Sequence, residues 1–296
     1  MALYWPAFEF SFGLDASRLL PFIAAIESCK AAASTAILPP QWRAGESSAV
    51  LQASLREQAE ASGEPVDEIQ LRKHAMALTL ATKSQAWVRL RFAPGCALIT
   101  LDDILSMHSM VAEEAGVRYS SAGIMRQEGQ AVITGTATIG IHVGAPAPRL
   151  PRLMHEYIQF VNGAMLNSLP PIIHALVAHF FITTIHPFSD GNGRVSRLVS
   201  AAILFQRGYN GHGFYALSNY FYENEERYHR ILFGLQQEPC PDLTEFIAFG
   251  MEGLALELRG INNFIKVKIN RIAARDELPL PRWRRALNSA ESSAQL

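Results

Sequence analysis

Several features are scarce in this sequence, and each absence excludes a class of protein. Only three cysteines are present in 296 residues, an odd and widely spaced set that argues against a disulfide framework or a zinc cluster and fits a reducing compartment. The formal net charge is −1, so no overall field attracts nucleic acid or an anionic membrane. No run approaches the ~18 uncharged apolar residues of a membrane span. We therefore expect a soluble, cytoplasmic protein.

Targeting signals, internal repeats and low-complexity segments are also lacking. The start, MALYWPAFEFSFG, has no positively charged region followed by a continuous apolar run, so no signal peptide is predicted. With 49% hydrophobic residues, the chain can bury a large core, which fits one large domain or one domain with a smaller companion.

What is present is mainly helical periodicity. Apolar residues recur at helical spacing in most of the chain, broken by segments that contain proline and glycine. The predicted helices cover residues 17–34, 47–62, 67–82, 101–116, 153–166, 170–185, 194–208, 218–236 and about 243–274. The helix 170–185 is apolar nearly all round, which predicts a buried central helix.

One segment is different. Residues 123–143, GIMRQEGQAVITGTATIGIHV, are rich in β-branched residues and interrupted by Gly129 and Gly135, which predicts a short β-hairpin. We expect an N-terminal helical region (1–100), a core (101–240) and a C-terminal helix with a basic tail (241–296).

The stretch HPFSDGNGRVSR, residues 186–197, lies between two predicted apolar helices. Gly191 and Gly193 allow a sharp turn and leave no side chain over the amides at the start of the next helix, where unpaired N–H groups and the helix dipole favour an anion. Arg194 and Arg197 share a face near that end and suit a polyphosphate. The spacing is not that of a Walker P-loop.

Two side chains of this stretch add reactivity. Mg²⁺ is commonly held by one or two carboxylates together with substrate phosphates, so Asp190 is a candidate metal ligand. His186 is the one group here whose ordinary pKa lies near neutrality, which makes it the candidate general base. Together these residues suit attack of a hydroxyl on a nucleotide phosphate.

A plainer interpretation exists for each residue. Asn-Gly is a common turn dipeptide, Asp190 could cap the following helix, and the arginines could form a solvated face. The combination at these spacings favours the functional interpretation.

HPFSDGNGRVSR resembles the signature of the Fic (filamentation induced by cyclic AMP) family, HPFx(D/E)GNGRxxR, at every fixed position. LYWPAFEFSF and ESSAV (46–50) resemble a bacterial subgroup with a Trp-Pro-containing helical N-terminal region. The resemblance implies an all-α Fic fold with a β-hairpin flap (123–143) near the active site. It also implies a protein adenylyltransferase, with ATP and Mg²⁺ as cofactors and a protein carrying a Tyr, Thr or Ser hydroxyl as partner. No DNA-binding domain is evident.

The resemblance also implies residue roles. His186 would deprotonate the target hydroxyl and Asp190 would hold Mg²⁺. The nucleotide would contact Gly191, Asn192, Gly193, Arg194, Arg197, Asn224 and Tyr228, with Arg194 at the β-phosphate, Arg197 at the γ-phosphate, and Asn224 and Tyr228 at the adenosine. The flap would align the target segment by strand-like pairing through Ile133, Thr134, Gly135, Thr136, Ala137 and Thr138.

Two positions depart from the family pattern. Many members have a second tyrosine after the position of Tyr228, where this chain has His229, so transfer of UMP or GMP stays an alternative to AMP.

Members often carry an inhibitory helix (S/T)xxxE(G/N), and its best match here places Leu51 and Gln52 at the Glu and Gly/Asn positions. Self-inhibition by that helix is therefore expected to be weak, with restraint left to a homo-oligomer or a separate regulator.

Other polar residues are given structural roles. His174 and His179, five residues apart on the apolar helix, are expected in the core or behind the site, and His142 and His155 at the surface or in the flap. The basic C-terminal stretch is expected to be a solvated face. A catalytically silent Fic-like interaction module remains the alternative from another class.

Overall fold

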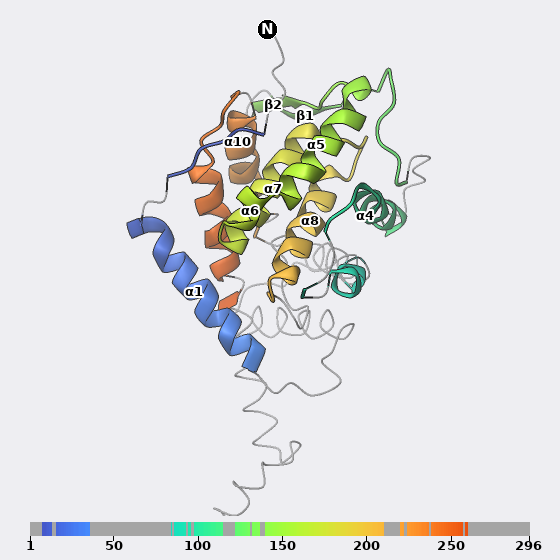
Figure 1. Cartoon of the computed structure of the whole chain (residues 1–296). Helices are drawn as coiled ribbons and strands as arrows, with labels where there is room; N and C mark the ends of the chain where they lie inside the picture. Colours follow the sequence, from blue (N-terminus) through green and yellow to red (C-terminus); the bar gives the residue numbers. More distant parts are fainter. Residues whose placement is uncertain are drawn as a thin grey trace, which may run out of the picture.

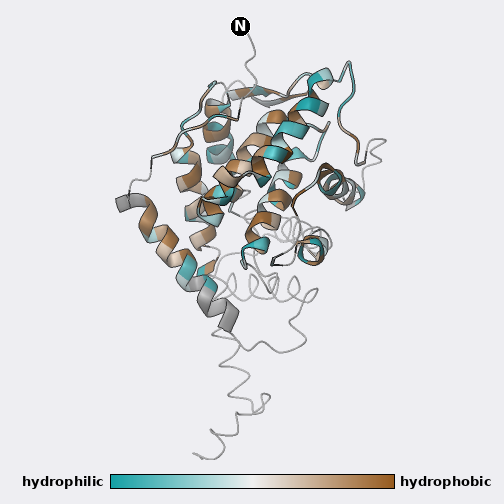
Figure 2. Cartoon of the chain, viewed as in Figure 1, coloured by the Kyte–Doolittle hydropathy of each residue, from teal (hydrophilic) through white to brown (hydrophobic). Residues whose placement is uncertain are grey.

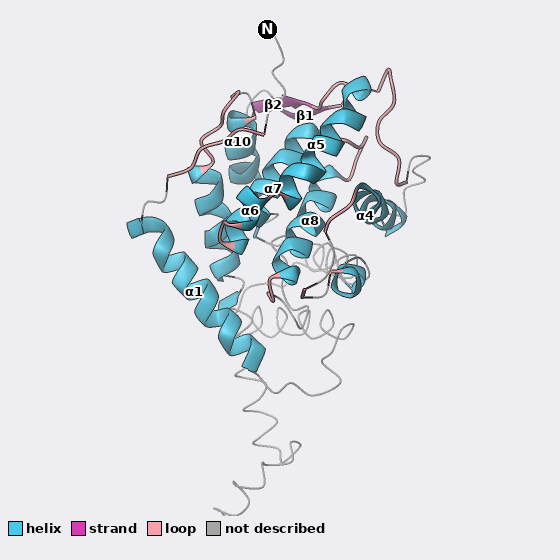
Figure 3. Cartoon of the chain, viewed as in Figure 1, coloured by secondary structure: helices cyan, strands magenta, loops and turns pink. Residues whose placement is uncertain are grey.

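The structure is a computed structural model, and it is mostly helical with one two-stranded antiparallel sheet (Figures 1 and 3). This arrangement confirms the predicted all-α fold with a short hairpin. The residues that it describes are 8–13, 16–35, 84, 86–92, 94–95, 98–114, 122–130, 132–136, 140–209, 220–221, 224–236, 238–256 and 258–259. The helices predicted over 47–62 and 67–82, together with Trp5 and residues 46–50, lie outside this set.

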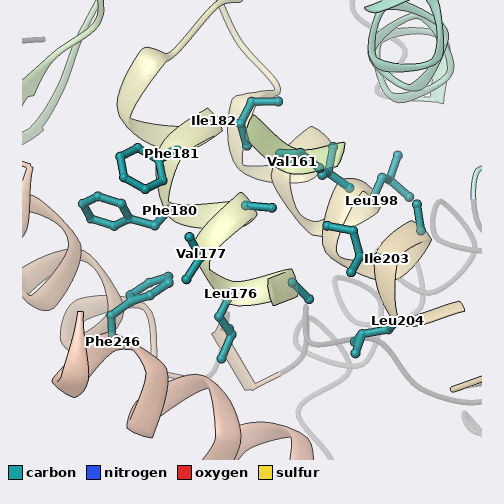
Figure 4. Close-up of a cluster of buried hydrophobic side chains, with 14 of the residues drawn as sticks. Val161, Leu176, Val177, Phe180, Phe181, Ile182, Leu198, Ile203, Leu204 and Phe246 are labelled. Carbon is teal, nitrogen blue, oxygen red and sulfur yellow. The ribbon is translucent and has the colours of Figure 1, made fainter. Parts of the chain in front are cut away.

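The centre of the molecule is α7 (Pro171–Ile185), whose residues from Ile172 to Ile185 are all buried. Its proline in the first turn is compatible with a helix start, because the missing N–H would have no intrahelical partner there. The helix packs most extensively against α8 (Asn192–Gln206) and also against α5 (Leu150–Asn162). Figure 4 shows Leu176, Val177 and Phe180 of α7 among the side chains of this core. The apolar sequence of α7 therefore places it where every face is covered.

Further helices complete the wall around α7 and α8. α4 (Leu101–Glu114) packs against α8, and α10 (Glu225–Leu235) packs against the second strand of the hairpin. α1 (Ala16–Thr35) lies along the outside (Figure 1). α5 carries both hydrophilic and hydrophobic residues, as expected of a helix with one face on the core (Figure 2). None of the described helices is long and apolar enough to span a membrane.

The hairpin consists of β1 (Ile133–Thr136) and β2 (Gly140–Val143). Its register pairs Ile133 with Val143 and Thr134 with His142. Cross-strand partners share a face and successive residues alternate, so Ile133 (67% exposed) and Ile141 lie on the outer face while His142 lies on the inner one. The predicted segment 123–143 thus contains the hairpin, but its strands begin only at residue 133.

Some predicted boundaries differ from the structure. The single helix expected over 153–166 is divided into α5 and α6 (Ala164–Asn167), because Gly163 adopts an extended conformation between them, and the 3₁₀ turn η2 (Ala147–Arg149) precedes α5. Within the helix predicted over residues 218–236, α10 begins only at Glu225. Residues 244–256 and 258–259 are helical, within the predicted 243–274. The division into three domains stays a prediction.

Three of the buried histidines, His142, His174 and His179, have strongly lowered pKa values and therefore neutral side chains. His174 and His179 lie on α7, as the sequence indicated, and His142 lies on β2. Burial lowers the pKa of His142 and of His174 to about 4 and that of His179 to about 3. The unfolded chain would bind protons at these positions near pH 6.5, whereas the folded chain would not.

Stability is therefore expected to fall as the pH drops from about 6.5 towards 4, and to be retained above 6.5. Each such histidine contributes a slope of up to about 1.4 kcal/mol per pH unit in that window. Urea unfolding at pH 7.5, 6.5, 5.5 and 5.0 measures the slope, and His174→Leu should reduce it. Equal free energies of unfolding at pH 7.5 and 5.0 would contradict this prediction.

Candidate active site

A cavity of about 420 Å³ lies where the end of α7, the start of α8, α10 and the hairpin meet. Its walls contain all the signature residues with a predicted role: His186, Asp190, Gly191, Asn192, Gly193, Arg194 and Arg197. Tyr228 from α10 and Ile133 and Thr134 from β1 also line it. The structure thus brings most of the predicted site residues to one cavity.

His186 terminates α7 in the left-handed region, with φ 55° and ψ 59°. The carbonyl of Thr183 accepts a hydrogen bond from Nδ1 of His186 at 3.2 Å, which fixes the proton on Nδ1 in the neutral ring. Burial lowers the pKa of His186 to about 4; the Thr183 bond and Asp190 oppose this shift, and the Arg126 cation reinforces it. At neutral pH the imidazole is therefore uncharged, and Nε2 is the nitrogen that can accept a proton.

The first turn of α8 provides backbone donors beside this imidazole. Gly191 precedes the helix with φ 80°, and no side chain among the described residues caps the helix start. The first N–H groups of a helix have no intrahelical partners, so the amides at the start of α8 suit an anion. A Cβ at Gly191 would come 3.3 Å from Val111 and 3.5 Å from His108, so the close packing of α4 as well as the positive φ favours glycine.

The side chain of Asn192 holds the loop closed. Its Oδ1 accepts a hydrogen bond from the backbone N–H of Phe188 at 2.9 Å, and its Nδ2 donates to the Phe188 carbonyl at 2.8 Å. Both polar ends of this buried amide are thereby used within the loop. Its main-chain N–H, in the first turn of α8, is the group that suits a phosphate.

Among the described residues, Asp190 is the one carboxylate that lines the cavity, and 57% of its side chain is exposed. It accepts a hydrogen bond from the N–H of Gly191, and Oδ2 lies 3.4 Å from Nη2 of Arg194. The described residues contain no group of three or more His, Cys, Asp or Glu side chains that could hold a metal ion. A single exposed carboxylate beside anion-binding amides fits Mg²⁺, which usually completes its coordination with phosphates and water.

Arg197 lines the cavity one turn beyond Arg194. Among the ion pairs between described residues, none includes Arg197. Burial lowers its pKa, and Tyr228 and Glu225 oppose that shift. A partly desolvated guanidinium in a cavity with anion-binding amides is suited to a phosphate.

Tyr228 and Asn224 have different positions relative to the cavity. Tyr228 is buried in its wall, and its hydroxyl lies 2.8 Å from Nε2 of His179, which places His179 directly behind the site. Asn224 is not among the lining residues; it precedes α10 and its Nδ2 donates to the carbonyl of Tyr220 at 3.0 Å. Gly135, with a φ of 98°, does not line the cavity either. Ala137 and Thr138 lie outside the described residues.

His142 lies in the hairpin, one of the two positions expected of it, but it is buried rather than at the surface, whereas His155 is exposed as predicted. The alternation along β2 turns His142 inward, where its Nε2 donates to the carbonyl of Thr184 at 2.9 Å. The rings of His142 and His186 are 5.9 Å apart. A short strand with one inward position is hard to orient from the sequence when the flanking residues are all β-branched or glycine.

His108 is a site residue that the sequence did not single out. Its ring stacks on Phe188 at 3.8 Å. Gly123 donates its N–H to Nδ1 of His108 at 2.9 Å, so Nε2 carries the proton and donates to the Asp190 carbonyl at 3.1 Å. Burial lowers the pKa of His108, in agreement with this neutral form. It thus ties the loop to α4.

On the α10 side, His229 and Phe233 also line the cavity, with their rings stacked at 5.1 Å. Burial lowers the pKa of His229. These two residues form an aromatic wall beside Tyr228, and only His229 had been noted from the sequence.

Comparisons with known proteins find relatives over the region that contains this loop. Residues 98–204 match the family described as the Fic/DOC family. Over 111 residues, the chain is 36% identical to the protein adenylyltransferase Fic of Drosophila grimshawi and 34% identical to that of Drosophila mojavensis. These alignments cover 38% of this chain and 21% and 20% of the relatives, so the chain matches about a fifth of their length.

Solved structures share the fold. A Fic family protein from Desulfovibrio desulfuricans G20 superposes with a TM-score of 0.58 at 19% identity, covering 87% of this chain and 76% of that one. A single-substitution variant of Fic-1 from C. elegans gives a TM-score of 0.58 at 18% identity, covering 86% of this chain and 74% of the other. The likeness extends over most of the helical architecture.

Proposed function

We propose that this chain, of which residues 98–204 match the Fic/DOC family, is a nucleotidyltransferase that moves AMP from ATP to the hydroxyl of a Tyr, Thr or Ser in a target protein. The observation that supports this most is the neutral imidazole of His186, with Nε2 available, in the same cavity as the first turn of α8. A base beside an anion-binding helix start is what hydroxyl attack on a phosphate requires.

In the proposed reaction, Nε2 of His186 takes the proton as the target oxygen forms a bond to the α-phosphorus. The bond between that phosphorus and the α–β bridging oxygen breaks, and pyrophosphate leaves. The amides at the start of α8 would stabilise charge on the phosphates, and Arg194 and Arg197 would contact the β- and γ-phosphates. Asp190 is the residue that would hold Mg²⁺, which when bound neutralises phosphate charge. Gly191 and Gly193 keep side chains away from these amides.

The target segment would lie along β1, where Ile133, Thr134, Gly135 and Thr136 present a short strand edge. Thr134 and Ile133 line the cavity, so a strand added there would bring its hydroxyl towards His186. Tyr228 would lie on the adenosine side together with His229, and Asn224 would join them only if its side chain leaves the Tyr220 carbonyl. A cytoplasmic location and a regulator or homo-oligomer form part of the same proposal.

The test is incubation of bacterial lysate with the purified protein, Mg²⁺ and ATP labelled in either the α- or the γ-phosphate. We expect label on protein from α-labelled ATP and none from γ-labelled ATP. Label from γ-labelled ATP would mean phosphoryl transfer, and preferential use of UTP or GTP would assign another nucleotide. A chain that transfers no nucleotide to any protein would be the silent interaction module.

The double substitution Leu51→Glu with Gln52→Gly is expected to lower activity. The resemblance places the new carboxylate opposite Arg197, although residues 51 and 52 lie outside the described residues. A charge-assisted pair of this kind would weaken ATP binding by about 10- to 100-fold. Titration calorimetry with ATP measures this effect. The matched control is Leu51→Gln with Gln52→Gly, and equal ATP affinity in the two variants would contradict the prediction.

A further inference from the structure

We propose that Arg126, which lies outside the HPFSDGNGRVSR segment, is the positioning residue of the base: it holds the main chain of His186 and fastens it to both ends of the flap. This role rests on the nucleotidyl transfer proposed above. Arg126 precedes the hairpin and is 4% exposed.

The side chain of Arg126 donates only to main-chain carbonyls. Its Nε and Nη2 both donate to the carbonyl of His186, at 2.9 and 2.8 Å. Nη2 also donates to Ala145 at 2.7 Å, and Nη1 donates to Gln130 at 2.8 Å. The backbone N–H of Arg126 donates to the carbonyl of Pro187 at 2.9 Å. A planar guanidinium with five N–H donors is the one side chain that can make this set of bonds.

These bonds fix an uncommon backbone conformation. His186 has φ 55°, a region that L-residues with a Cβ avoid, and a proline follows it. Such a conformation persists where its surroundings determine it. The two bonds of Arg126 hold the carbonyl, and the Thr183 carbonyl holds Nδ1, so the main chain and the ring are oriented together.

The bonds also link the base to the flap. Gln130 lies just before β1 and Ala145 just after β2, and the N–H of Gly144 donates to Val132 at 2.9 Å to close the base of the hairpin. Arg126 therefore joins both ends of the hairpin to His186. A target strand aligned on β1 would be held in a fixed relation to Nε2.

The main chain at Gly144 packs so closely against Arg126 that a side chain there has no room. A Cβ at Gly144 would lie 2.8 Å from Nη2 of Arg126 and 3.0 Å from Cβ of His186. Arg126 and His186 would have to move to make room for it, which gives a second way to disturb the same contacts.

Arg126 also keeps a positive charge near the imidazole. Among the ion pairs between described residues none includes Arg126, and burial lowers the pKa of Arg126 without a carboxylate to compensate. The cation disfavours an imidazolium at His186, in the same direction as burial. The other titratable and charged groups of the cavity are His142 on β2, Asp190 in the loop, Arg194 and Arg197 on α8, and Tyr228 and His229 on α10.

The first test compares Arg126→Met and Arg126→Lys with the wild-type chain by NMR titration of the His186 ring, which needs no nucleotide. In Arg126→Met we expect the pKa of His186 to rise, and in Arg126→Lys, which keeps the charge, to rise less. In both variants kcat for transfer should fall by about 100-fold because the fork of hydrogen bonds is lost, while the ATP affinity changes by less than about twofold. If Arg126 had only a structural role, its replacement would not raise the pKa of His186, and it would not lower kcat while leaving the ATP affinity unchanged.

The second test does not alter Arg126. Gly144→Ala should lower kcat by a similar factor with little change in ATP affinity. Gly234→Ala on α10 is the matched control, because a Cβ there meets nothing within 4 Å. In the wild-type chain, the Nε–H of Arg126 should give a resolved, slowly exchanging NMR signal.

An unchanged pKa of His186 and unchanged kcat in a folded Arg126→Met chain would overturn the proposal. So would a rapidly exchanging Nε–H in the wild type, a result that can be obtained even if both variants fail to fold. If the NMR results are as expected but the wild-type chain transfers no nucleotide, the proposed function fails and the positioning contact stands.

Discussion

Replacing His186 by alanine is expected to reduce nucleotide transfer by about 10²- to 10⁴-fold, the usual contribution of a general base. Nδ1 of His186 donates its proton to the Thr183 carbonyl, so Nε2 is the proton acceptor that His186→Ala removes. ATP affinity should change by less than about twofold, because the groups assigned to the phosphates lie on the loop and α8. Initial rates with α-labelled ATP and calorimetry with ATP measure the two quantities separately.

The matched control is His155→Ala, since His155 is exposed on α5.

In the wild type, the rate should not be limited by protonation of the base between pH 8 and about 5, because the pKa of His186 is about 4 and the base is lost only as the pH falls through that value. The prediction fails if His186→Ala transfers AMP at the wild-type rate, or if it stops binding ATP.

Replacing Arg197 by methionine is expected to weaken ATP binding by about 10- to 100-fold, which corresponds to the loss of a charge-assisted bond of about 1.5–3 kcal/mol. Arg197 lines the cavity and is in none of the ion pairs between described residues, so its charge is available to a phosphate. Because Arg197 is assigned to the γ-phosphate, ADP binding should weaken much less. Calorimetric titrations with ATP and ADP, both with Mg²⁺, give this comparison.

Arg152→Met is the control for loss of one positive charge, because Arg152 is 85% exposed and, among the described residues, pairs with Glu156 alone, four residues along α5. We expect it to bind both nucleotides as the wild type does. An Arg197→Met chain that loses ATP and ADP equally would assign Arg197 to another part of the nucleotide, and one that keeps ATP affinity would remove it from the site.

The sequence predicts the helices of this fold most clearly where a long run of apolar residues can only be a buried helix. α7 is apolar all round and its predicted end at residue 185 is the observed one, because the following proline cannot continue the ladder. The signature loop was located correctly because its glycines, acid and arginines are contiguous. The break at Gly163 was missed, since a single glycine in a helical pattern is often tolerated.

The contacts that orient the site are the part that could not be predicted. Arg126 and His108 lie 60 and 82 positions from their partners His186 and Asp190. Nothing in their immediate sequence distinguishes them from residues that face solvent. The burial of His142 could not be predicted for the same reason, because only the register of the hairpin shows which face it occupies. The resemblance assigns Asn192 to the nucleotide, whereas the structure uses its side-chain amide to close the loop.

The central claim is that the cavity between α7, α8 and α10 holds the phosphates of a nucleotide beside the uncharged imidazole of His186. A crystal structure with Mg²⁺ and α,β-methylene-ATP tests it most directly. The account predicts phosphate oxygens at the amides of Gly193 and Arg194, with Nε2 of His186 facing the α-phosphorus. A nucleotide bound elsewhere, or one with its γ-phosphate in front of His186, would contradict it.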